Sequence, residues 1–370
     1  MPHDNGHILA INPGSTSTKF GVYTRDGAEL VRTIRHSEEE LAQFHGRPVL
    51  SQHNFRAAQI RCELEKAGYD AGGFDAVAGR GGLLPPVPSG TFLVDAAMLE
   101  ELRLAREGEH ASNLGGMLAH SFAEAAGVNA YVVDPVSVDE WQPLARISGS
   151  TLMPRTPLCH ALNTKAVTRR FAREEHREYT SLRLIVAHMG SGTCVSAHEN
   201  GRMIDNNTGE DGPFGVDRSG TLPVRPLIRA CFSGTYTQHQ LEELVFGSGG
   251  IVDYLGTRDL IEVERRIDEG EAKAVLVFNA MVYQIAKEAG AMAAVLRGEV
   301  DAILLTGGMA KSARLVSQLS EYLRWIAPIR VYPGEDELQS LADGVFRVLS
   351  GEEQVQRLQR KSPTLDAVAG

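Results

Sequence analysis

Two short apolar runs flank a turn of glycine and hydroxyl residues near the start of the chain. Residues 8–23 read ILAINPGSTSTKFGVY. Short apolar runs separated by turn residues are typical of paired β-strands, and the Pro13-Gly14 pair favours a sharp reversal between them. The pattern predicts a β-hairpin whose tip carries Asn12 and a block of hydroxyl side chains.

A second hairpin of the same design is predicted at residues 184–205, LIVAHMGSGTCVSAHENGRMID. When Gly14 is aligned with Gly190, each copy shows an apolar strand, one polar residue, a Gly/Ser/Thr turn and a second strand. The polar residue is Asn12 in the first copy and His188 in the second. Each copy continues through a glycine-centred turn into a third strand, so the repeat indicates two domains of similar architecture.

The elements after each hairpin repeat as well. Apolar residues at helical spacing predict an amphipathic helix over 51–67 in the first half and over 271–297 in the second. Each helix is followed by an aspartate, an apolar strand and two glycines, at 74–82 and 300–308. Chance similarity between two ordinary α/β units is the alternative interpretation.

We therefore expect two α/β domains, residues 1–180 and 181–370. A further strand is predicted at 131–140, and the glycine- and proline-rich segment 209–226 is expected to form an irregular, functional loop. The tail after Gly351 is expected to form a short helix and can pack back on the first domain.

Composition excludes several classes of protein. Hydrophobic residues make up 43% and charged residues 23% of the 370 residues, as is typical of a soluble globular protein. The net charge of −10 argues against nucleic acid as a partner, because a phosphate backbone would be repelled. A polar N-terminus followed by only four apolar residues predicts neither a signal peptide nor a membrane span.

The four cysteines are scattered without a CxxC pair, at Cys62, Cys159, Cys194 and Cys231. This spacing predicts neither a zinc site nor a disulfide framework. A reducing, cytoplasmic location is expected.

Turns rich in glycine, serine and threonine suit phosphate binding. They expose backbone N–H groups and hydroxyl donors at one point, as phosphate oxygens require. Neither the Walker A pattern GxxxxGK[ST] nor GxGxxG opening a helix occurs in the chain, so the P-loop and Rossmann interpretations lack their motifs. A single turn of this composition can equally be only a turn, and the duplication is what favours phosphate binding.

Two arginines are candidates for anion binding. Arg80 directly follows a predicted buried strand, where a guanidinium is costly unless it meets an anion or an acid. Arg218 lies in the long loop of the second half, and two guanidiniums converging on one point would clamp a carboxylate or a phosphoryl group. The alternative for each is an ion pair with a neighbouring acid, such as Asp217 for Arg218.

Two histidines are candidates for phosphate contacts. His160 precedes a predicted helix, whose N-terminus would attract an anion, and His188 takes the position of Asn12 in the repeat. Packing is the alternative for both. The chain has no HExxH motif, which argues against zinc.

Acidic side chains must supply any magnesium site. Asp134 follows a predicted strand, and Glu335, Asp336 and Glu337 form a turn before a helix. Acids at such a turn are often helix caps. Because Mg²⁺ bound to a nucleotide needs only one or two protein carboxylates, a sparse acidic set is sufficient.

Nine motifs in order now carry a family resemblance: INPGSTSTK, GRGGLL, GEHASNLG, VDPVSVDE, HALNTKAV, AHMGSG, DRSGTLP, LTGGMA and VYPGEDEL. Over about residues 8 to 350 the chain resembles the acetate, propionate and butyrate kinase family. The resemblance implies an α/β fold of two duplicated actin-like (ribonuclease H-like) domains with an interdomain cleft, the first on the substrate side and the second on the nucleotide side. It also implies reversible ATP- and Mg²⁺-dependent phosphorylation of a short-chain carboxylate to an acyl phosphate, in a homodimer or larger assembly.

The resemblance also assigns roles to residues of the first half. Asn12 and the turn after it would approach Mg²⁺ and the transferring phosphoryl group. Arg80 would hold the carboxylate, and Asp134 would orient Arg80. The turn residues concerned are Gly14, Ser15 and Ser17.

In the second half, Arg218 and His160 would stabilise the phosphoryl group in flight. Either Glu335 or Asp336 would be the metal-side acid. The segment His188, Gly190, Ser191 and Gly192 would line the ATP phosphates, and Gly307, Gly308 and Met309 would lie against the adenosine. Ser191 stands where acetate kinases carry Asn, so the donor at that point differs from theirs.

Charge suggests the mechanism. A short fatty acid is already ionised at neutral pH, because its carboxyl titrates near that of Glu, so no general base is required. The obstacle is repulsion between two anions, which positive charge and fixed donors would offset in a direct in-line transfer. The alternatives are an acetate or propionate kinase, which would differ in the depth of an apolar pocket, and an ATP-gated binding or scaffold protein on the same fold.

Overall fold

The computed structural model describes residues 6–70, 72–209 and 211–359. The chain forms two units, Met1–Asp139 with Asp336–Gly370, and Glu140–Glu335. This division differs from the expected boundary near residue 180. Segment 140–180 belongs to the second unit because helix α6 (Ala161–Glu174) buries Val167 and Phe171 in a core that it shares with strands of that unit.

The first unit contains a six-stranded sheet in the order β3-β2-β1-β4-β6-β5. The predicted hairpin is confirmed: β1 pairs antiparallel with β2, and the amide of Gly14 donates to the carbonyl of Ser17 at 2.8 Å to close the turn. β1 also pairs parallel with β4, and β4 with β6. The strands are β1 (Ile8–Pro13), β2 (Ser17–Thr24), β3 (Gly27–Arg35), β4 (Ala76–Arg80), β5 (Thr91–Leu93) and β6 (Asn129–Val133).

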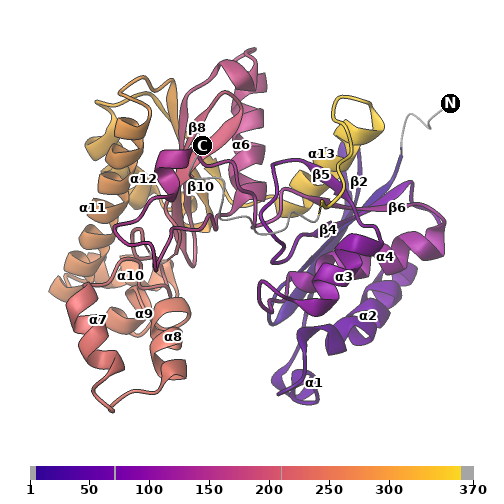
Figure 1. Ribbon diagram of the computed structural model, residues 1–370, viewed down its shortest axis with the longest axis horizontal. Helices are drawn as coiled ribbons and strands as arrows, with labels where there is room; N and C mark the ends of the chain where they lie inside the picture. The colour runs from indigo at the N-terminus through magenta and orange to yellow at the C-terminus, as the bar shows by residue number, and fades with distance from the viewer. Residues whose placement is uncertain (1–5, 71, 210, 360–370) are drawn as a thin grey trace. The chain divides into compact units, whose positions relative to one another are not determined.

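Helices cover both faces of this sheet (Figure 1). Val132 packs against α4, whereas the adjacent Val133 packs against Gly344 of α13. Because neighbouring strand residues point to opposite faces, α4 and α13 lie on opposite sides. The helix predicted over 51–67 is present as η1 followed by α2. The helices are α1 (Glu38–Ala42), η1 (Val49–Gln52), α2 (His53–Lys66), α3 (Ala96–Leu104), α4 (Asn113–Ala126) and α13 (Glu337–Leu349).

The second unit repeats the arrangement, with a five-stranded sheet in the order β11-β10-β7-β8-β9. β7 pairs antiparallel with β8 and parallel with β10, as β1 pairs with β2 and β4. The predicted duplication is therefore confirmed at the level of strand pairing. The strands are β7 (Leu184–Met189), β8 (Thr193–Glu199), β9 (Arg202–Asn206), β10 (Ala302–Gly307) and β11 (Ile329–Pro333).

Alternate residues of β7 again face opposite layers. Ile185 and Ala187 belong to the core under α11, whereas Leu184 and Val186 pack against α6. The long helix predicted over 271–297 is α11. Figure 1 shows α7 to α10 gathered in one group within this unit. The helices are α5 (Pro143–Arg146), α6, η2 (Tyr179–Ser181), α7 (Val224–Cys231), α8 (Gln238–Phe246), α9 (Ile251–Leu255), α10 (Leu260–Asp268), α11 (Ala272–Val295), η3 (Gly308–Lys311) and α12 (Ala313–Leu323).

The expected C-terminal helix is wrong for residues 352–359, and residues 360–370 lie outside the described part of the chain. The backbone of Gln356 pairs instead with Phe92, and its amide donates to the carbonyl of Thr91 at 2.9 Å. The reason is that this segment satisfies backbone hydrogen-bonding groups of strand β5. A helix over residues 352–359 would leave those groups without this partner. In the described residues, no helix has the length and apolar character needed to span a bilayer.

Candidate active site

Arg80, Asn12 and Glu337 meet at the carboxyl end of β1 and β4. Arg80 ends β4, is 8% exposed, and forms an ion pair with Glu337, the first residue of α13. The side-chain Nδ2 of Asn12 donates to the other oxygen of the Glu337 carboxylate. Glu337 is therefore the acid that the buried Arg80 requires, although it lies 325 positions after Asn12 in the sequence.

Glu337 was assigned no role by the sequence, although it belongs to the acidic turn. Asp336, which precedes it, takes the left-handed conformation at φ 35°, and its side chain does not cap the helix. Glu335, the first acid of the turn, lies 3.6 Å from His188 Nε2. Glu335 and Glu337 thus contact different partners, and the cap interpretation does not apply to Asp336.

Asp134 follows β6 and is 1% exposed. Its carboxylate accepts hydrogen bonds from Ser89 Oγ at 2.6 Å and from the amide of Gly90 at 2.8 Å. Its backbone is left-handed, with φ 37°. These bonds fix Asp134 immediately beyond Val133, which pairs with Arg80 in the sheet register.

Gly14, Ser15 and Ser17 form the tip of the first hairpin. A residue that the sequence did not single out, Arg56 of α2, bonds to the carbonyls of all three, at distances of 2.8 to 3.0 Å. Nothing in the pattern of α2 marks this arginine, because polar positions on an amphipathic helix normally face solvent.

The second glycine turn, Gly190–Gly192, lies against Arg218. A Cβ on Gly192 would come within 2.8 Å of Arg218 Cδ, so only glycine permits this approach. Among the described residues no acid pairs with Arg218, and its buried Nε has no hydrogen-bond partner. The expected alternative, a pair with Asp217, is wrong: Asp217 lies 3.6 Å from Arg258 instead. Arg218 is therefore a half-buried cation beside a turn of backbone donors.

His160 and His188 stack on each other, with ring centroids 3.9 Å apart and planes 11° apart. His160 sits at the start of α6, as predicted, and His188 is 1% exposed on β7. A second residue that the sequence missed, Asn163, fixes His188. Its Nδ2 donates to the carbonyl of Glu335 at 3.0 Å, so its Oδ1 accepts from His188 Nδ1 at 2.8 Å.

Gly307 and Gly308 close the end of β10. Gly307 has φ 88°, and a Cβ there would lie 2.3 Å from the carbonyl oxygen of Met189, so β7 and β10 come together only with glycine at this position. A Cβ on Gly308 would meet no described atom within 4 Å. Met309 is 5% exposed and packs in the core. Of this trio, Gly308 has open space beside it.

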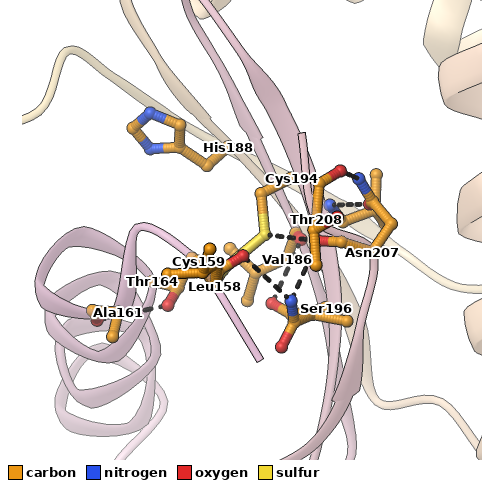
Figure 2. The surroundings of a disulfide bond; sticks show 12 residues. Leu158, Cys159, Ala161, Thr164, Val186, His188, Cys194, Ser196, Asn207 and Thr208 are labelled. Carbon is orange, nitrogen blue, oxygen red and sulfur yellow. Dashed lines mark hydrogen bonds between the residues drawn. A yellow bond between two sulfur atoms is a disulfide. The ribbon is translucent and has the colours of Figure 1, made fainter. Parts of the chain in front are cut away.

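A disulfide joins Cys159 and Cys194, which corrects the expectation that the cysteines are unpaired (Figure 2). Their Cα atoms lie 6.2 Å apart, although 35 positions separate them in sequence. The pairing arises because β8 runs beside the segment that leads into α6. The correction concerns this site directly, since Cys159 precedes His160 and Cys194 pairs with His188 in the sheet register.

In the described part of the chain, no cluster of three or more His, Cys, Asp or Glu side chains is arranged to hold a metal ion.

Comparison with known proteins identifies relatives over nearly the whole chain. The model of the Acetokinase family matches residues 156–327. A Listeria innocua protein named probable butyrate kinase is 46% identical over 346 residues, which cover 93% of this chain and 97% of that protein. The chain belongs to the acetokinase family. A Listeria monocytogenes protein of the same name shows the same identity and coverage.

Solved structures of acetokinase type share the fold. Porphyromonas gingivalis acetate kinase aligns with a TM-score of 0.75 at 18% identity, covering 92% of this chain and 99% of its own. A propionate kinase from Francisella tularensis aligns with a TM-score of 0.71 at 16% identity, covering 91% and 98%. The two duplicated actin-like domains expected for this family are thus confirmed.

Proposed function

We propose that this member of the acetokinase family is a butyrate kinase, which transfers the γ-phosphoryl group of ATP to a short-chain fatty carboxylate and forms an acyl phosphate reversibly. The observation that carries the proposal is Arg218, a half-buried guanidinium without an acidic partner in the described chain, lying against the Gly190–Gly192 turn. A cation held beside backbone donors is suited to phosphoryl oxygens. The relatives named butyrate kinase support the choice of acid.

Arg80 would bind the substrate carboxylate. Its guanidinium is buried at a strand end and already pairs with a carboxylate, that of Glu337. Asp134, held by Ser89 and Gly90, would maintain the strand end from which Arg80 projects. The substrate is already an anion at neutral pH, so this group has to orient it and not to deprotonate it.

Arg218 and His160 would stabilise the phosphoryl group during transfer. His188 and the turn residues Gly190, Ser191 and Gly192 would line the phosphate chain, and Gly308 would leave room for the adenosine beside Met309. Gly14, Ser15 and Ser17 would contact the transferred group from the first hairpin. Because attack and departure occur in line, we propose inversion at phosphorus, without a phosphoenzyme. Retention of configuration with a chiral γ-phosphate would contradict this.

Magnesium would enter with the nucleotide. The acidic turn would supply the metal-side acid, Glu335 or Asp336, because both oxygens of the third acid, Glu337, already contact Asn12 and Arg80. When bound, the ion neutralises charge on the β- and γ-phosphate oxygens. We further propose a homodimer or larger homo-oligomer.

The test is acyl phosphate formation, trapped with hydroxylamine, for acetate, propionate, butyrate, isobutyrate and branched valerates. Butyrate or a branched relative is expected to have the highest kcat/KM. A higher kcat/KM for acetate or propionate would mean that the protein is an acetate or propionate kinase instead. If no acid yields an acyl phosphate, the kinase proposal is refuted and an ATP-gated binding protein is favoured.

A matched pair of variants tests the role of Arg218. Arg218→Met is expected to lower kcat by about 100-fold or more, the range seen when one donor to developing charge is removed. Arg258→Met removes the arginine that pairs with Asp217 and should leave kcat within about twofold of the wild type. Equal activity of the two variants would remove the observation on which the proposal depends.

A further inference from the structure

Arg56 lies beneath the first hairpin turn. It belongs to α2 and is 1% exposed. One terminal nitrogen donates to the carbonyls of Gly14 and Ser17 at 2.8 and 2.9 Å, and the other donates to the carbonyl of Ser15 at 3.0 Å. Gln52 holds the guanidinium from the opposite side, with its Oε1 at 3.0 Å from Nε and 2.8 Å from the second terminal nitrogen.

No carboxylate of the described residues pairs with this cation. Within residues 6–70, 72–209 and 211–359, all the acceptors of Arg56 are carbonyl, amide or hydroxyl oxygens, including Thr18 Oγ1 at 2.9 Å. Burial lowers the pKa of Arg56 to about 10, so it keeps its charge at neutral pH. A buried guanidinium without an acid is costly, and its positive potential extends into the turn above it.

The contact with Arg56 occupies carbonyl groups of the turn and does not involve its amide groups. The carbonyls of Gly14, Ser15 and Ser17 accept from Arg56, and that of Thr16 accepts from the amide of His36 at 2.9 Å. The amides of Ser15 and Thr16, both exposed, donate to no group among the described residues. The turn therefore presents free N–H donors outwards while every carbonyl is occupied.

We infer that Arg56 is a positioning residue that makes the Gly14–Thr18 turn an anion site, by binding the turn's carbonyls and adding an unneutralised positive charge behind its free amides. The ligand is a phosphoryl group, whether the γ-phosphate of ATP or the phosphate of an acyl phosphate. The inference rests on the proposed function, because that function supplies the phosphoryl group.

The experiment compares Arg56→Met and Arg56→Lys with Arg61→Met. Arg61 lies on the same helix and stacks over Phe122 with its guanidinium carbon 5.3 Å from the ring centroid, so this variant controls for general damage to α2. We expect Arg56→Met to lower kcat/KM for ATP at least about tenfold, a loss of about 1.4 kcal/mol. KM for the carboxylate should change less than about twofold, because Arg80 keeps its partners. Arg56→Lys should recover part of the loss, because lysine restores the positive charge but not the forked donors of the guanidinium.

The two phosphoryl sources are separated by assaying both directions, with ATP plus butyrate and with butyryl phosphate plus ADP. A fall in kcat/KM for ATP alone assigns the turn to the nucleotide, and a fall for butyryl phosphate alone assigns it to the acyl phosphate. Equal behaviour of Arg56→Met and Arg61→Met in both directions would overturn the inference, as would a parallel loss for the carboxylate and the phosphoryl donor.

Two measurements keep the test decisive. If Arg56→Met does not fold, as judged by circular dichroism, Gln52→Met retains the arginine but loosens it, and is expected to show a smaller loss with the same selectivity; unchanged ATP kinetics would overturn the inference. Calorimetric binding of MgATP tests Arg56 without turnover. Failure of the wild-type protein to make acyl phosphate would refute the proposed function, whereas MgATP binding that is equally strong in the Arg56→Met and Arg61→Met variants would refute the role of Arg56.

Discussion

The Cys159–Cys194 bond gives the sharpest prediction for stability. Replacing both cysteines by serine opens a loop of 35 residues. In the chain-entropy treatment, closing a loop of this length lowers the entropy of the unfolded state by about 13 cal/mol/K. The bond therefore stabilises the fold by about 3.8 kcal/mol at 25 °C. For a domain of this size each kcal/mol shifts Tm by roughly 2–4 °C, so the variant should melt roughly 8–15 °C lower.

The assay is thermal unfolding with and without reductant. Reducing the wild-type protein should lower its Tm to that of the Cys159→Ser/Cys194→Ser variant, and the variant should not respond to reductant. The matched control is Cys62→Ser/Cys231→Ser, which removes the two exposed free cysteines and should melt like the wild type. Denaturing alkylation before reduction should modify Cys62 and Cys231 only. Modification of all four cysteines, or a Tm indifferent to reductant, would refute the reasoning.

Three further predictions concern single side chains. Burial, and second to it repulsion from Asp211, raises the pKa of Glu288 from 4.5 to about 7. The folded state therefore keeps a proton that the unfolded state releases between pH 4.5 and 7, so the free energy of unfolding falls as pH rises over that range. Glu288→Gln should flatten this fall in urea titrations and gain at most about 3 kcal/mol at pH 8, from about 1.4 kcal/mol per pH unit; an unchanged pH profile would contradict it. Arg80→Lys should lower kcat/KM for butyrate at least about tenfold with little change in KM for ATP, because the fork is lost; a selective loss for ATP would contradict the assignment. Asn163→Leu should lower kcat about tenfold by freeing the His188 ring, and Asn163→Asp, which keeps an acceptor, should lose less; equal losses would indicate a packing role only.

Part of the site was readable in the sequence because its signal is local. Gly192 and Gly307 stand at turns where a Cβ would come too close to a neighbouring residue, and Arg80 directly follows an apolar strand. Strand ends and glycine turns leave their mark within a few residues. The same holds for the duplicated hairpins, because each copy has an apolar strand, a polar residue and a glycine turn within a short stretch of chain.

The partners of these residues were not readable in the same way. Arg56 is 42 positions from Gly14, Glu337 is 325 from Asn12, and Cys159 is 35 from Cys194. In sequence, an arginine on an amphipathic helix and a glutamate at a helix start look like ordinary solvated charges.

The sequence by itself determined the elements, their duplication and the location of the glycine turns, since each depends on the chemistry of a short stretch of chain. The tertiary structure decided which polar side chains are buried and what they meet. That outcome depends on how helices settle on the two faces of each sheet, because desolvation forces a buried charge to find partners wherever packing brings them.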